Sequence, residues 1–182
     1  YLDADIETNR LKQALSDTLN HHPYLKARLE QEEDGQLYLV AHNNDPVIIQ
    51  EKTVRNREEA LQQIGSRFNL LHDNLYRFVI YTFGNGQRML YMDFHHILCD
   101  GMSCMNFHKE VSQCYDLLIN GQTPDTTEAS ERYGFDLCET EYNERQTSKL
   151  DEAKTWYEQT FAPAAELDSL PLPQPELTGN GD

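Results

Sequence analysis

The segment 75–83 (LYRFVIYTF), the turn sequence 84–86 (GNG) and the segment 88–94 (RMLYMDF) together decide the fold. Segment 75–83 is rich in β-branched and aromatic residues, which favour a strand, and 88–94 follows the turn as the returning strand. Gly-Asn-Gly between them is a strong signal for a tight turn. The sequence therefore predicts a β-hairpin with strands at 75–83 and 88–94.

Helical segments surround this hairpin. Apolar residues recur at three- and four-residue steps, or the composition is helical, in four stretches: 7–20, 56–68, 102–119 and 145–161. Thr8 is the expected cap of the first helix. The buried face expected for the third helix is made of Met105, Val111, Tyr115 and Leu118.

Shorter strands complete the pattern. Segments 24–31 and 36–41, separated by the turn sequence EEDG, predict a second hairpin, and 47–49 is a further extended run. Strands and helices in this order predict an α/β sandwich, an α+β arrangement in which helices pack on a mixed sheet. Residues 166–182 are rich in Pro and lack periodicity, so the expected organisation is a domain at 1–165 followed by a linker.

Composition excludes several classes of protein. The chain has 182 residues and a formal charge of −16, which repels nucleic-acid phosphates and anionic lipid, so neither is an expected partner. No stretch approaches the roughly 18 apolar residues of a membrane-spanning helix. The four cysteines form no CxxC pair, which favours reduced thiols in a cytoplasmic protein.

One polar cluster lies between the second hairpin strand and the third helix. His95, His96, Asp100 and Gly101 follow the apolar strand directly, where a sheet fixes loop geometry. Imidazole suits proton transfer near neutral pH. A bare His pair is more often a hydrogen-bonded structural feature than a catalytic one. A metal site is a weak alternative, since adjacent strand residues point to opposite faces, and Ser103 lacks the GxSxG context of a hydrolase.

A resemblance to a known family extends this interpretation. Residues 95–103 (HHILCDGMS) match the HHxxxDGxS motif of condensation domains of nonribosomal peptide synthetases, which belong to the chloramphenicol-acetyltransferase-like acyltransferases. Residues 21–29 (HHPYLKARL) resemble the family's upstream RHExLRTRF element. Segments 68–70 and 75–77 resemble its FDL…PLLR segment, and the similarity extends from about residue 2 to residue 175.

The resemblance implies a two-lobe architecture. Condensation domains consist of two similar lobes that face each other across a channel, and this chain corresponds to the amino-terminal lobe. Its first residues match the interior of the family's first strand, which agrees with the absence of an initial Met. Residues 166–182 fall where the lobes are joined. The missing carboxy-terminal lobe is therefore an expected partner.

The resemblance also implies an activity. Condensation domains form an amide between two substrates delivered on the phosphopantetheine arms of carrier proteins, with no cofactor bound directly and with an adenylation domain in the parent chain. His96 is expected to act as a general base or to hydrogen-bond the amine, and the N–H of Gly101 to face the reacting carbonyl. His95 and Asp100 are expected to support the site, Asp100 by pairing with Lys26 or Arg28.

Other functions stay open at this point. Epimerisation domains share the motif, and a non-catalytic module that recruits carriers or other partners is a different class; a metal-binding regulator is a third. Cyclising relatives replace both His residues with Asp and do not match. Two positions depart from the family: Met102 replaces the usual Trp or Val, and Asp93 is either a surface residue or a partner for a His ring.

Overall fold

The computed structural model describes residues 1–125 and 133–161. The chain divides into two compact units, Tyr1–Phe135 and Asp136–Asp182. The predicted linker at 166–182 lies outside the described residues.

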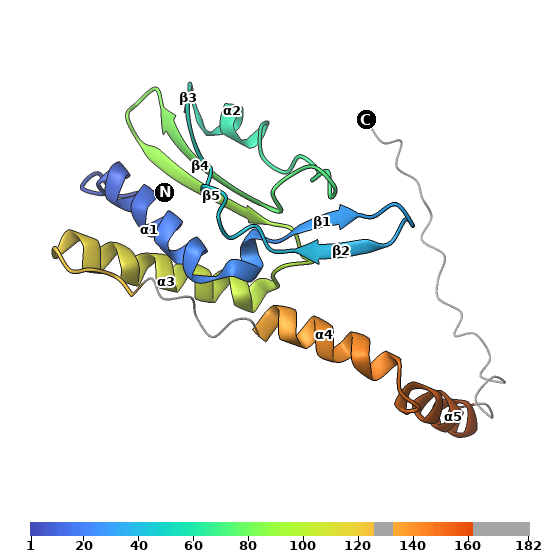
Figure 1. Ribbon diagram of the computed structural model, residues 1–182. Helices are drawn as coiled ribbons and strands as arrows, with labels where there is room; N and C mark the ends of the chain where they lie inside the picture. The colour runs from blue at the N-terminus through green and yellow to red at the C-terminus, as the bar shows by residue number, and fades with distance from the viewer. Residues whose placement is uncertain (126–132, 162–182) are drawn as a thin grey trace, which may run out of the picture. The chain divides into compact units, whose positions relative to one another are not determined.

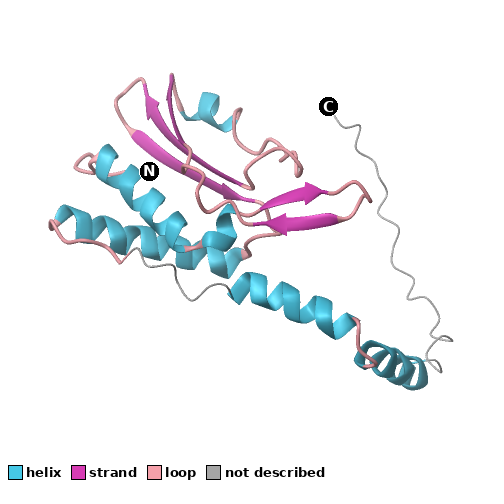
Figure 2. Ribbon diagram, viewed as in Figure 1, coloured by secondary structure: helices cyan, strands magenta, loops and turns pink. Residues whose placement is uncertain are grey.

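The first unit combines a mixed sheet, a separate hairpin and two long helices (Figures 1 and 2). Its helical elements are α1 (Thr8–His21), the 3-10 helix η1 (Pro23–Lys26), α2 (Arg57–Leu61) and α3 (Gly101–Ile119). Its strands are β1 (Arg28–Gln31), β2 (Leu37–Val40), β3 (Ile49–Val54), β4 (Tyr76–Phe83) and β5 (Arg88–Phe94). Helix α4 (Tyr133–Arg145) begins within the last residues of the first unit and continues into the second unit.

The sheet has three strands in the order β3-β4-β5. Strands β4 and β5 are antiparallel, with Ile80 opposite Leu90, which confirms the predicted hairpin. Gly86 has a φ of 83° in the connecting turn, a conformation that favours glycine. Strand β3 runs parallel to β4, so the sheet is mixed, as predicted. Strands β1 and β2 form the second predicted hairpin apart from this sheet.

Strand β4 is buried on both faces because its side chains alternate between two apolar clusters. Tyr76, Phe78 and Ile80 contact the face covered by α1 and α3, which lie side by side against the sheet (Figure 1). Val79, Tyr81 and Phe83 contact the opposite cluster, which includes Ala60 of α2. The strand that the sequence marked most clearly is therefore the centre of the core.

Helices α1 and α3 bury one face each. The buried apolar residues are Leu11, Ala14, Leu15 and Leu19 of α1 with Phe107, Val111, Cys114 and Leu118 of α3. The face predicted for the first helix is confirmed. In α3, Val111 and Leu118 are buried as predicted, but Met105 is 67% exposed. Met105 lies two residues from Phe107, about 200° around the helix, and so points away from the core.

Several predicted boundaries were wrong. Thr8 does not cap α1; its Oγ1 accepts a hydrogen bond from Arg88 Nη1 at 2.7 Å. The strand predicted from residue 24 begins at Arg28, because Pro23 starts a helical turn in which Ala27 N–H donates to Tyr24 O. The extended run expected at 47–49 is β3, which starts at Ile49 and continues to Val54.

The predicted helix at 56–68 is much shorter than expected. Helix α2 ends at Leu61, and the chain then reaches Gly65, whose φ of 80° is incompatible with helix. Asn56 caps its start by accepting a hydrogen bond from Glu59 N–H at 3.0 Å. The short helix is therefore fixed by a cap at one end and by glycine at the other.

The second unit is described from Asp136 to Phe161. The helix predicted at 145–161 is present as α5 (Lys149–Phe161), whereas α4 was not predicted. On α5 the rings of Trp156, Tyr157 and Phe161 contact one another, with Trp156 and Tyr157 centroids 5.0 Å apart. Across both units, no helix of the described residues is long and apolar enough to cross a membrane.

Candidate functional site

The HHxxxDG segment forms a tight loop between β5 and α3. His95 N–H donates to Leu75 O at 2.8 Å, so the loop begins on the backbone of the neighbouring strand segment. Leu98 N–H then donates to His95 O at 3.0 Å and closes a turn. The chain reverses within residues 95–98 and enters α3 at Gly101. A short connection between two buried elements therefore holds both histidines.

The ring of His95 is fixed by two contacts. Its Nδ1 accepts a hydrogen bond from Ile97 N–H at 3.2 Å, which places the proton of a neutral ring on Nε2. Its edge meets the ring of Phe68 at a centroid distance of 5.7 Å. Arg77 lies over the same Phe68 ring, with its guanidinium carbon 3.7 Å from the centroid. The His95 ring is therefore held by Ile97 and Phe68, and Phe68 is in turn covered by Arg77.

Asp93 does not hold a histidine tautomer. Its carboxylate accepts a hydrogen bond from Tyr91 OH at 2.9 Å and lies 3.7 Å from Arg77 Nη1. Burial, together with the hydrogen bond to Asp93 and its charge, raises the pKa of Tyr91 to about 12. Asp93 thus belongs to a polar group on the strand that orients Arg77, and Arg77 in turn contacts Phe68.

His96 differs from its neighbour in being exposed. Within residues 1–125 and 133–161, no hydrogen bond or ion pair engages its ring. Large apolar side chains close to it in sequence are also exposed, namely Ile97, Met102 and Met105. The loop therefore presents a free imidazole together with apolar surface.

Asp100 and Gly101 begin α3. The Asp100 carboxylate accepts hydrogen bonds from Ser103 N–H at 2.8 Å and from Ser103 Oγ at 2.7 Å, and these bonds lower the pKa of Asp100. Asp100 is thus the N-cap of the helix. A Cβ added at Gly101 would meet no atom within 4 Å, and its φ is not positive. Neither space nor backbone strain within this chain requires glycine at 101.

The expected pairing of Asp100 with Lys26 or Arg28 is wrong for this structure. Lys26 is 3% exposed, and its Nζ donates to Asn20 Oδ1 at 2.8 Å and to the carbonyls of Asn43 and Asp45 at 2.6 Å each. Burial lowers the pKa of Lys26. Lys26 is therefore already satisfied by an oxygen of α1 and by two oxygens of the loop after β2.

Arg28 also has other partners. Its Nη2 lies 2.7 Å from Asp45 Oδ2, and its Nε donates to Asn74 Oδ1 at 2.8 Å. Asn74 immediately precedes Leu75, the residue to which His95 is hydrogen-bonded. Lys26 and Arg28 thus organise the loop around Asp45 and the start of β4, and the cap of α3 satisfies Asp100 separately.

Replacing Lys26 with Met is expected to lower the free energy of unfolding by about 1–3 kcal/mol, because the buried Lys26 side chain no longer donates to Asn20 Oδ1 and to the carbonyls of Asn43 and Asp45. Urea unfolding followed by circular dichroism measures the change. Lys12→Met is the matched control: Lys12 is partly exposed and lies 2.5 Å from Glu51, a surface pair worth below about 1 kcal/mol. Equal losses for the two variants would contradict the assignment of Lys26.

A buried apolar cluster lies beneath the loop. Leu98 and Cys99 of the motif pack with Leu75 and Ala27, and Phe68 is among the partly buried residues around them. This apolar cluster was not predicted from the sequence, although the apolar pair Leu98-Cys99 inside a polar motif indicates buried positions. The packing explains how the loop remains fixed while His96 is exposed.

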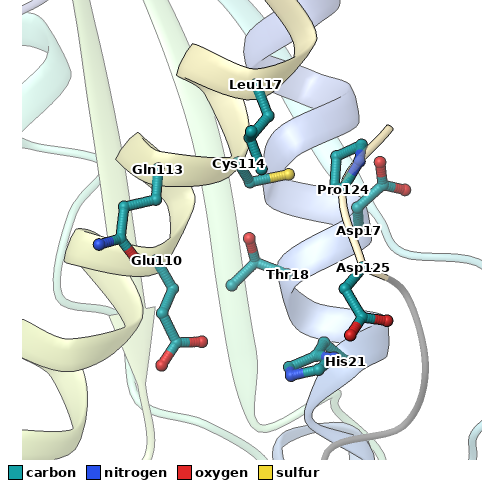
Figure 3. Close-up of a pocket in the computed structure, with 9 residues that line it drawn as sticks. All are labelled: Asp17, Thr18, His21, Glu110, Gln113, Cys114, Leu117, Pro124 and Asp125. Carbon is teal, nitrogen blue, oxygen red and sulfur yellow. The ribbon is translucent and has the colours of Figure 1, made fainter. Parts of the chain in front are cut away.

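A concavity lies between α1 and α3, and none of the motif residues 95–103 lines it (Figure 3). Its volume is about 260 Å³. It is lined by Asp17, Thr18, His21, Glu110, Gln113, Cys114, Leu117, Pro124 and Asp125. His21 Nδ1 is buried there without a hydrogen-bond partner among the described residues. Among those same residues no group of three His, Cys, Asp or Glu side chains is placed to hold a metal ion.

Replacing Asp17 with Asn is expected to stabilise the chain at neutral pH. Burial raises the pKa of Asp17 above its usual range, so the unfolded chain loses this proton at lower pH than the folded chain. Stability contributed by the protonated group is therefore lost as pH rises. Urea unfolding should show a gain for Asp17→Asn at neutral pH that shrinks in acid. Asp5→Asn, an exposed site with the same charge change, should show a smaller gain; a pH-independent difference from wild type would contradict the account.

The chain is similar to segments of much longer proteins. The chain is 26% identical over 117 residues to a plipastatin synthase protein of Bacillus subtilis (strain 168), an alignment covering 63% of this chain and 3% of that protein. It is 28% identical over 132 residues to the hybrid PKS-NRPS synthetase traA of Penicillium crustosum, covering 68% of this chain and 3% of that protein. The chain thus spans a small fraction of the length of these relatives.

A solved structure supports the fold. The starter condensation domain of rhizomide synthetase RzmA superposes with a TM-score of 0.69 at 19% identity, over 86% of this chain and 39% of that one. This likeness confirms the predicted chloramphenicol-acetyltransferase-like fold. The family model described as Condensation domain matches residues 1–180. Because that match covers nearly the whole sequence, the chain belongs to the condensation-domain family.

Proposed function

We propose that this chain carries the catalytic motif for amide formation between carrier-bound substrates in nonribosomal peptide synthesis. The observation that carries the proposal is the exposed ring of His96 beside the fixed ring of His95, within a chain of the condensation-domain family. An intact and accessible imidazole favours a catalytic domain over a module that only recruits partners.

In the proposed reaction, the α-amine nitrogen of the acceptor attacks the carbonyl carbon of the donor thioester. His96 accepts the proton released by the attacking amine, or hydrogen-bonds that amine. The C–S bond then breaks, the proton passes to the leaving phosphopantetheine thiolate, and the amide remains on the acceptor arm. No cofactor beyond these substrate arms takes part in the proposal.

Gly101 is the proposed second catalytic group. It is the first residue of α3, where backbone N–H groups are free of helical partners and favour a developing negative charge. Its N–H is proposed to face the oxygen of the tetrahedral intermediate. Open space where a side chain at 101 would stand supports close approach of a substrate carbonyl.

The remaining motif residues support these groups. His95 is proposed to fix the turn through Ile97 and Phe68, and Asp100 to hold the start of α3 through Ser103. Lys26 and Arg28 are proposed to support the site indirectly by ordering the loop around Asp45 and the start of β4.

The proposed partners are carrier-protein domains, a carboxy-terminal lobe and an adenylation domain in the parent chain. In this proposal residues 1–165 form the amino-terminal lobe and 166–182 the connection between lobes. The net charge of −16 disfavours long-range attraction to an acidic carrier protein, so docking depends on local basic and apolar residues. Free thiols at all four cysteines fit a cytoplasmic location.

The test compares this chain with a longer chain that contains both lobes. Each is mixed with a donor and an acceptor carrier protein loaded with aminoacyl thioesters, and amide product is measured by mass spectrometry. We expect amide product with the two-lobe chain and none with the isolated chain. Product from the isolated chain would refute the requirement for a second lobe. Absence of amide with solvent-deuterium exchange at an acceptor α-carbon would instead indicate epimerisation.

A further inference from the structure

We propose that Cys99 and Cys104 are an oxidation site, at which a peroxide converts the two thiols into a reversible disulfide across the motif. Cys99 is the last residue of the loop before the cap of α3, and Cys104 lies on the first turn of that helix. The inference concerns the thiols themselves and does not depend on the proposed function.

The geometry brings the two sulfur atoms together. Cys99 Sγ and Cys104 Sγ are 3.1 Å apart and share a hydrogen bond. A disulfide bond is about 2.0 Å long, so the atoms need to approach by only about 1 Å. The backbone between them is ordered by Cys104 N–H, which donates to Asp100 O at 2.9 Å, and by the Ser103 bonds to the Asp100 carboxylate. The folded chain therefore holds the pair in place before oxidation.

The surroundings of the two thiols indicate which of them the oxidant reaches first. Cys99 is 6% exposed and lies in the apolar cluster under the loop, where burial raises the pKa of its thiol to about 12. Cys104 is partly exposed at the edge of the same cluster. A dissolved oxidant therefore reaches Cys104 first, and Cys99 resolves the product from inside the fold.

The reaction balances with hydrogen peroxide as oxidant. The Cys104 thiolate attacks one peroxide oxygen, the O–O bond breaks, and the products are a Cys104 sulfenic acid and hydroxide, which takes up a proton to become water. The Cys99 sulfur then attacks the sulfenic sulfur, the S–O bond breaks, and the S–S bond forms. A second water leaves with the Cys99 proton. Both sulfurs are oxidised, both peroxide oxygens are reduced, and a dithiol restores the two thiols.

The other cysteines have different surroundings. Cys114 is buried between α1 and α3, and Cys138 is exposed on α4. Among the described residues, neither has a sulfur neighbour comparable with the Cys99–Cys104 pair. Cys138 is thus a matched control for simple exposure, and Cys114 for burial.

The cross-link is expected to restrain the motif. It closes a small ring that contains Asp100, Gly101 and Ser103, the residues that start α3. The loop bearing His96 is then tied covalently to the helix. Amide hydrogens at 99–104 should exchange with solvent more slowly after oxidation, and a dithiol should restore the original rates.

The experiment treats the full chain with hydrogen peroxide after removal of reductant. We expect the intact mass to fall by two hydrogen atoms, the free thiols of the denatured chain to fall from four to two, and peptide mapping to show a Cys99–Cys104 link. Cys138→Ser should still lose two hydrogen atoms, whereas Cys104→Ser should not.

The variants keep the test decisive. Cys104 is partly exposed, so Cys104→Ser is expected to fold, and circular dichroism checks this directly. A link that includes Cys114 or Cys138 would overturn the proposal. Oxygen addition to Cys104 without a cross-link, or the same loss of two hydrogen atoms in Cys104→Ser, would overturn it as well.

Discussion

Replacing His96 with Ala in a two-lobe chain is expected to lower the rate of amide formation by about 10²–10⁴-fold, the usual contribution of a positioned proton acceptor. The ring is exposed and engages no described hydrogen-bond partner, so its removal leaves no buried group unpaired. The loss should therefore fall on kcat, with little change in the free energy of unfolding. Quenched-flow assays with loaded carriers measure the rate, and urea unfolding measures the stability.

Two other histidines give the controls for this variant. His72→Ala removes another exposed ring, from the loop before β4, and should leave the rate unchanged. His95→Ala removes the contacts with Phe68 and Ile97 and should reduce stability as well as rate. A His96→Ala domain with the wild-type rate would contradict the proposed role of the imidazole.

Replacing Phe78 with Ala is expected to lower the free energy of unfolding by about 3–5 kcal/mol, the usual cost of removing a large buried aromatic ring. Phe78 is 1% exposed at the centre of β4. Its ring lies 5.2 Å from Tyr76, 5.6 Å from Phe94 and 5.7 Å from Phe107, measured between centroids. Truncation to Ala would therefore leave a cavity between the sheet and α3 and remove the ring contact with Phe107.

Urea unfolding of the full chain measures this loss. Phe78→Leu should lose less than Phe78→Ala because it leaves a smaller cavity. Leu37→Ala, a truncation at a side chain that is 56% exposed on β2, should change stability by about 0.5 kcal/mol at most. If Phe78→Ala unfolded at the wild-type urea concentration, the core described for this sheet would be wrong.

The parts of the fold that the sequence predicted well are those set by local pattern. Strand β4 is a nearly continuous run of apolar and aromatic residues. The glycines at 84 and 86 mark the turn into β5, and Gly86 has a positive φ. Helix α1 has apolar residues at helical spacing on one face, and its buried residues match that face. Local signals and tertiary packing agree in these elements, so pattern alone was sufficient.

Pairing between distant segments could not be predicted. The parallel alignment of β3 with β4 joins Ile49 to Phe78, and nothing in either segment specifies that partner. The same limit applies to the site. Lys26 or Arg28 was expected to pair with Asp100, but two of the three acceptors of Lys26 are the carbonyl oxygens of Asn43 and Asp45, and backbone oxygens carry no sequence signal.

The motif itself was more informative than its surroundings. The order of His95, His96, Asp100 and Gly101 marked the loop correctly, and the capping role of Asp100 follows from its place before α3. The different exposure of the two rings depends on Phe68 and on the turn at 95–98, which only the folded chain reveals.

The loop presents His96 as an exposed imidazole, whereas the His95 ring is held by Ile97 and Phe68. Acylation of the folded chain with diethyl pyrocarbonate, followed by peptide mass spectrometry, measures the reactivity of each of the seven histidines. His96 should react as fast as the exposed His72 and His108, and His95 and the buried His22 should react far more slowly. Protection of His96 to the level of His22 would contradict the account.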